Sequence, residues 1–167
     1  PYQVVGGVNF YQRKEIKDIL AYLKTIDSGM DDLAVQRIIN VPRRGIGATS
    51  IGKVMNFAGA HNLRFYEALK ESDLIDTLGK VHGKIEGFVD VIENLRAQAS
   101  ALDLPDLIEA VIRDTGYEDE LKNDDAVSVQ ARMENIQELI NKAADFSIRA
   151  KEKEDLLGRF LEEVALV

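Results

Sequence analysis

Cysteine and tryptophan are absent from this 167-residue sequence, which holds only two histidines and three prolines. Without cysteine the chain can form neither disulfides nor thiolate metal sites, and only His61 and His82 could supply an imidazole ligand. A structural zinc needs four ligands of these kinds, so we expect no metal site. His82 is interpreted as a structural or surface residue, because no second ligand lies near it in the sequence.

Long apolar runs are missing as well. No stretch approaches the roughly 18 to 20 apolar residues that cross a bilayer, and no signal-peptide pattern opens the chain. We therefore expect a cytoplasmic protein with no membrane partner. Because Pro1 has no methionine before it, we also expect the chain to be part of a longer protein.

The motifs of common catalytic sites are missing too. The chain has no G-x-x-x-x-G-K-[ST] phosphate loop, no H-E-x-x-H zinc motif and no glycine-flanked serine at a strand-to-helix turn. Its carboxylates are plentiful, but the acidic run "EDELKNDD" at residues 118–125 is interpreted as a solvated loop. We expect no catalytic residue and no cofactor in this chain.

Negative charge is in excess, and it is unevenly distributed. The net charge is −8, and 46% of the residues are hydrophobic, enough for the core of one domain. Residues 1–70 hold ten Lys/Arg against six Asp/Glu, whereas residues 71–167 hold 11 against 23. A polyanion is therefore expected to meet the first segment, with the acidic remainder acting as a solvated surface or a repulsive guide.

Hydrophobic periodicity predicts helices along nearly the whole chain. The exception is a short strand-like run at residues 2–5, which two glycines end. An amphipathic helix is expected over residues 13–26, and a short helix that takes Asp32 as its N-cap must stop before Pro42.

Two longer stripes follow. Apolar residues alternate at spacings of three and four from Leu78 to Leu102, and a second stripe runs from about residue 128 to 150. A shorter helix is expected after Pro105, and Gly116 would be its left-handed C-cap. Another short helix is expected near the C-terminus. The sequence thus predicts an all-α, multi-helix domain with the two long helices as its spine.

A glycine-rich connection at residues 40–50, "NVPRRGIGATS", joins two of the short helices. Glycines allow a tight turn and leave backbone amides uncovered, and Thr49 or Ser50 would start the second helix, whose N-terminus favours an anion. Arginines and a lysine would add charge-assisted contacts, and Ile46 would anchor the turn in the core. The pattern indicates a helix-hairpin-helix-like region over residues 32–61 that binds phosphate.

The alternative interpretation is an ordinary helix connection. Gly45 would then be a C-cap, Gly47 a turn residue and the arginines surface charges, all of which are common in α-helical domains. The coincidence of the arginine pair, G-I-G, an N-cap and the basic half of the chain favours phosphate contact.

The sequence also resembles a known family. The run "YQVVGGVNFYQRKEIKDILAYLK", followed by "RIINVPRRGIGATSI", is similar to the region between the motor halves of the UvrD/Rep/PcrA-type superfamily 1 DNA helicases, nearest to the PcrA branch. The similarity is specific in the first third; beyond residue 70 it depends on helical pattern, "DTGY" and "RMENIQEL".

This resemblance implies that residues 1–167 are the helical 2B subdomain of such a helicase, with residues 1–12 at the junction with the motor domain. The parent would be a 3′–5′ ATP-dependent DNA helicase acting in repair or replication, using ATP and Mg²⁺, whereas this chain alone would be inactive. Its expected partners are double-stranded DNA at a fork or junction and the remaining helicase domains. The expected duplex-contact residues are Arg43, Arg44, Gly45, Ile46, Gly47, Thr49 and Lys53.

A second class of function remains open. The acidic, all-α remainder could be a protein-interaction module that docks a repair or transcription partner. Salt-dependent duplex binding at residues 41–53 would favour the first function, and a salt-insensitive protein contact on the long helices the second.

Overall fold

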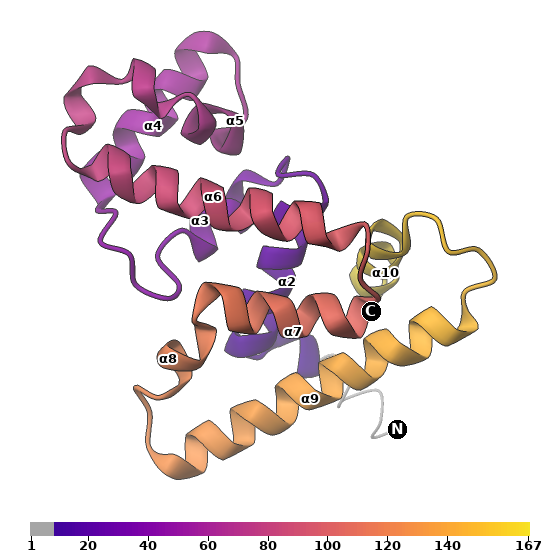
Figure 1. Cartoon of the computed structure of the whole chain (residues 1–167). Coiled ribbons are helices and arrows are strands. Elements are labelled where there is room, and N and C mark those ends of the chain that lie inside the picture. The colour runs from indigo at the N-terminus through magenta and orange to yellow at the C-terminus, as the bar shows by residue number, and fades with distance from the viewer. Residues whose placement is uncertain (1–8) are drawn as a thin grey trace.

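A computed structural model describes residues 9–167, most of which are helical (Figure 1). In chain order the helices are α2 (Lys14–Asp27), α3 (Asp32–Ile38), α4 (Ala48–His61), α5 (Phe65–Lys70), α6 (Val81–Ala99), α7 (Leu104–Thr115), α8 (Tyr117–Leu121), α9 (Ala126–Arg149) and α10 (Leu156–Ala165), with the 3₁₀ turns η1 (Ser72–Leu74) and η2 (Asp76–Leu78) before α6. The predicted all-α fold is confirmed. The predicted strand at residues 2–5 lies outside the described residues.

Helix α2 is the centre of the domain, because it contacts α3, α6, α7, α9 and α10. Its predicted apolar face is buried, and Ile16, Ile19 and Leu23 expose none of their surface. Because other helices surround α2, some of its polar side chains are buried too, among them Asp18 and Thr25. Burial of a carboxylate is costly unless charged or hydrogen-bonding groups compensate it.

Three side chains compensate Asp18, one from α2 itself and two from other helices. Its carboxylate accepts hydrogen bonds from Arg37 Nε at 2.9 Å, from Lys14 Nζ at 3.1 Å and from the Tyr117 hydroxyl at 2.7 Å. Burial, and then the negative charge of Asp18, raise the pKa of Tyr117, so the phenol stays protonated and donates. Asp18 therefore ties α2 to α3 and α8.

The two long helices are α6, with 19 residues, and α9, with 24, and α7 lies between them and contacts both (Figure 1). Helix α6 is shorter than the predicted stripe. Gly79 adopts φ +59°, which a right-handed helix does not accommodate, so Leu78 falls in η2 before the helix. At the other end α6 stops at Ala99, so Leu102 lies outside it.

Helix ends agree in part with the predicted caps. Gly116 closes α7 with φ +74°, as predicted. The prediction of Asp32 as the N-cap of α3 is wrong: Asp31 accepts the hydrogen bond from Ala34 N at 3.1 Å, and Asp32 is the first helical residue. Two adjacent aspartates offer the same chemistry, and backbone geometry selects between them.

The interpretation of residues 118–125 as a loop is also wrong in its first half. Residues Tyr117–Leu121 form α8, and Glu120 lies 3.5 Å from Lys14 Nζ. Farther on, Asp124 forms an ion pair with Arg132 of α9. Buried Tyr117 and Leu121 hold the short helix against the core, a packing effect that outweighs its high charge.

Candidate nucleic-acid interface

The connection between α3 and α4 spans residues 39–47, here called the hairpin, and buried contacts fix its shape. Ile46 is 1% exposed, which confirms its predicted place in the core. The Asn40 side chain closes the loop, because its Nδ2 donates to Ile46 O at 2.5 Å and its Oδ1 accepts from Ile46 N at 3.0 Å. These hydrogen bonds therefore join the two ends of the hairpin, and the buried Ile46 side chain fixes it to the core.

The two arginines of the hairpin lie in different surroundings. Arg43 is exposed, whereas Arg44 is partly buried. The Nη1 atom of Arg44 donates to Ile38 O at 2.8 Å and to Ile39 O at 3.1 Å, the carbonyls at the C-terminal end of α3. Arg44 thus donates to backbone acceptors at the end of the helix, where Ile38 O also accepts from Val41 N at 3.0 Å.

Aromatic side chains hold the same guanidinium in place. Arg44 Nη2 donates to the Tyr22 hydroxyl at 2.6 Å, and that hydroxyl donates to Val41 O. The guanidinium carbon also lies 4.9 Å from the centre of the Phe88 ring, within the range of a cation–π contact. Arg44 therefore links the hairpin to α2 and α6, and its donors are directed to groups of the protein.

The start of α4 is open to solvent. The helix begins at Ala48 with Gly47 as its N-cap, so the predictions of Thr49 and Ser50 as the cap are wrong. Among the residues that the structure describes, no side chain caps these first amides, and Gly47, Ala48 and Thr49 are exposed. Uncapped amides at the positive end of a 14-residue helix are suitable for an anion.

The two glycines of the hairpin differ in their backbone. Gly45 adopts φ +78°, the left-handed region, whereas Gly47 has φ −75° and ψ 169°, which any residue can adopt. A Cβ added at Gly45 would lie 3.0 Å from Lys84 Nζ, and one added at Gly47 would meet nothing within 4 Å. The backbone geometry thus requires glycine at position 45. At position 47 it does not, and the missing side chain only leaves the space around Gly47 open.

This difference predicts unequal stability effects. Gly45→Ala should lower the free energy of unfolding by about 1 to 2 kcal/mol, because alanine is strained at positive φ. Gly47→Ala should leave the unfolding free energy unchanged within about 0.5 kcal/mol. Urea unfolding of the two variants is the measurement, and equal losses at both positions would contradict the assigned backbone.

Two lysines flank the hairpin. Lys53, one turn into α4, shares a face with Thr49, and its Nζ donates to Thr77 O at 2.7 Å. Lys84 of α6 is exposed and reaches Gly45, a contact that no pattern in the sequence indicates. No local signal marks Lys84, because it comes to the hairpin from a helix that starts far along the chain.

Acidic α8 borders the other side of the hairpin. Arg43 shares a hollow with Asn40, Glu120 and Asn123. The hairpin therefore carries an exposed arginine next to a helix of opposite charge, and it leads into the uncapped amides of α4, with two lysines nearby.

Other kinds of site are not found in the described residues. Within residues 9–167 no group of three His, Asp or Glu side chains is arranged to hold a metal ion. Across the same residues, no helix combines the length and apolar character that a membrane span requires.

Comparison with known proteins points to one family. The sequence profile of the UvrD-like helicase C-terminal domain matches residues 1–167. The chain is 38% identical over 166 residues to the ATP-dependent DNA helicase PcrA of Bacillus subtilis, covering 99% of this chain and 22% of that protein. It is 37% identical over 167 residues to the PcrA helicases of Staphylococcus epidermidis and Staphylococcus aureus, covering 100% of this chain and 23% of each. The chain thus spans less than a quarter of the length of these relatives, and it belongs to the UvrD-like helicase C-terminal domain family.

Proposed function

We propose that this chain is the 2B subdomain of an ATP-dependent 3′–5′ DNA helicase, and that its hairpin holds the phosphate backbone of duplex DNA. The observation that carries the proposal is the open N-terminus of α4, whose uncapped amides follow exposed Arg43 in the same connection. Backbone amides, a helix N-terminus and a guanidinium are the groups that bind phosphate in proteins.

The structure supports a division of roles within the predicted site. Arg43, Gly45, Gly47 and Thr49 are exposed on the hairpin and the first turn of α4, with Lys53 and Lys84 beside them. Arg44 and Ile46 act indirectly, because they hold the turn that presents these exposed groups. The proposal therefore assigns direct phosphate contact to the exposed set and a positioning role to Arg44 and Ile46.

The remaining parts of the function belong to a longer protein. ATP and Mg²⁺ would be bound by the parent, since the chain carries no phosphate loop of the Walker type. Residues 1–12 would form the junction with the motor domain, and residues 32–61 the helix-hairpin-helix-like region. The proposed place of action is a fork or junction in cytoplasmic DNA repair or replication.

Duplex binding should be weak, dependent on salt and independent of sequence. Two or three cations release few counterions, so log K against log salt should have a slope of about −2 to −3, with a dissociation constant near 10⁻⁴ M. Phosphate contacts read no base edges, so duplexes of different sequence should bind equally. Titration of a labelled duplex at several salt concentrations is the measurement; a slope near zero or a strong sequence preference would contradict the proposal.

A further inference from the structure

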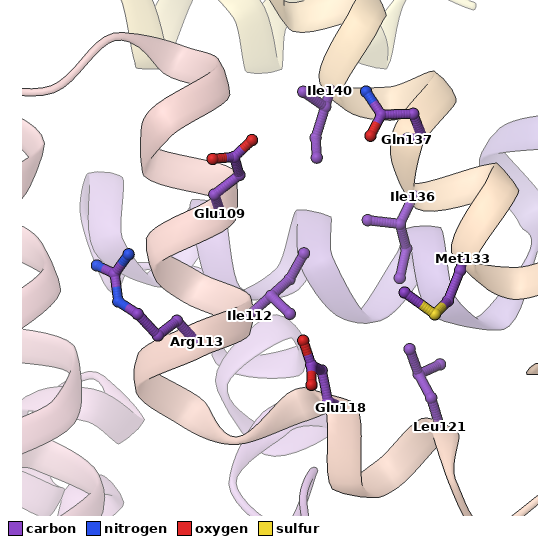
Figure 2. A pocket seen from close by; sticks show the side chains of 9 residues that line it. All are labelled: Glu109, Ile112, Arg113, Glu118, Leu121, Met133, Ile136, Gln137 and Ile140. Atoms are coloured by element: carbon purple, nitrogen blue, oxygen red, sulfur yellow. The ribbon is translucent and has the colours of Figure 1, made fainter.

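A cleft formed by the acidic second half of the chain has no role in the proposed DNA contact. It lies between α7, α8 and α9 and has a volume of about 240 Å³ (Figure 2). Its apolar lining consists of Ile112, Leu121, Met133, Ile136 and Ile140. Pockets for drug-sized ligands hold about 300 to 1,000 Å³, so this cleft is of a size for one or two side chains.

Residues 9–167 leave the apolar lining incompletely covered. Met133 falls within the apolar stripe predicted for about residues 128–150, yet 48% of its surface is exposed. Met133 lies on a part of α9 that α7 does not cover, because α7 ends at Thr115 and the chain turns away at Gly116. In Figure 2, Met133, Ile136 and Leu121 face the same opening.

The rim of the cleft is negative. Glu109 and Glu118 are exposed, and neither forms an ion pair with a described residue. The one cation of the rim, Arg113, is already paired with Asp114 Oδ1, 3.0 Å from its Nε. A partner that fills the apolar floor would therefore gain from a lysine or arginine placed against Glu109 or Glu118.

We propose that this cleft docks a short, basic amphipathic helix of a partner protein. All three elements that line the cleft are helices, so the cleft offers no strand edge with which a partner backbone could pair, and a helix satisfies its own backbone groups. Apolar side chains one turn apart would enter between α7 and α9, with basic side chains against Glu109 and Glu118. This surface is separate from the hairpin and does not depend on DNA binding.

The three methionines of the chain allow a direct test with internal controls. Met30, Met55 and Met133 are exposed to similar extents, 52%, 48% and 48%, but only Met133 lines the cleft. A chain with ¹³C-labelled methionine methyl groups would be titrated with a synthetic amphipathic helix of about 15 residues, carrying leucines one turn apart and flanking lysines. A peptide with glutamate in place of each lysine is the matched probe.

The lysine peptide should shift the Met133 signal alone and bind about tenfold more tightly than the glutamate peptide. Glu109→Lys with Glu118→Lys should reverse this preference, while Asp73→Lys with Asp90→Lys, the same charge change away from the cleft, should keep it. Equal shifts of all three methionines, no shift at about 1 mM peptide, or no dependence on peptide charge would overturn the proposal. A Met133 shift with protein concentration alone would overturn it in favour of a second copy of this chain.

Discussion

Arg44→Ala should lower the free energy of unfolding by about 3 kcal/mol, whereas Arg43→Ala should change it by less than about 0.5 kcal/mol. Removing Arg44 takes from Ile39 O the donor that the structure gives it, removes one of the two donors to Ile38 O, which still accepts from Val41 N at 3.0 Å, and ends the contact with Phe88. Partly buried acceptors without a partner cost about 1 to 3 kcal/mol, and the lost cation–π contact adds to this.

The two alanine variants remove the same side chain from adjacent positions, so each is the control for the other. Thermal unfolding is the measurement; a loss of 3 kcal/mol corresponds to about 6 to 12 °C in a domain of this size. Arg44→Lys should recover only part of the loss, because an ammonium group cannot donate in the same planar fork. Equal losses for Arg43→Ala and Arg44→Ala would show that the guanidinium of Arg44 is not held inside the protein.

Asp18→Ala should have an effect of similar or larger size, about 3 to 5 kcal/mol. Asp18 is 1% exposed and accepts from groups on α2, α3 and α8, so its loss strands the buried hydroxyl of Tyr117 and separates Arg37 from its counter-ion. Arg37 and Lys14 can reach water, but the phenol cannot without movement of α8.

Asp18→Asn separates charge from hydrogen bonding at this position. The amide oxygen can still accept from Tyr117, so this variant should lose less than Asp18→Ala, and the difference reports the hydrogen bonds together with the packing of the amide group. Equilibrium urea unfolding compares the two. If Asp18→Ala were as stable as the unchanged chain, the carboxylate would not be the link between α2, α3 and α8.

The helices could be predicted from the sequence because their signals are local. Apolar residues spaced three and four apart mark α2 and α9, and Gly116 marks the end of α7, without any knowledge of the rest of the fold. The start of α6 was predicted too early, and the reason is also local. Glycine is compatible with both helical and positive-φ backbone, and only the structure shows that Gly79 has a positive φ.

The roles of individual side chains could be predicted only in part. Arg43 and Arg44 are the same residue at adjacent positions, and which one meets the end of α3 depends on how the hairpin returns toward Tyr22 and Phe88. The approach of Lys84 to Gly45 depends in the same way on the packing of α6. Met133 fits the periodicity of a core residue but lies where the facing helix has ended.

Reversing the charge of both arginines together would therefore be a poor test of phosphate contact. A glutamate at position 44 would disrupt the hairpin itself, so a loss of binding would not distinguish contact from folding. The single change Arg43→Glu avoids this problem, because Arg43 is exposed.

Duplex affinity of Arg43→Glu tests the central claim most directly. Lys151→Glu, an equal charge change at an exposed residue of the α9–α10 connection, is the control, and at about 0.1 M salt distant charges are screened beyond about 10 Å. Fluorescence anisotropy of a labelled duplex should show affinity at least about tenfold lower for Arg43→Glu, a salt slope reduced in magnitude by about 1, and little change for Lys151→Glu. Equal affinities for the two variants, with both folded, would contradict phosphate binding by the hairpin.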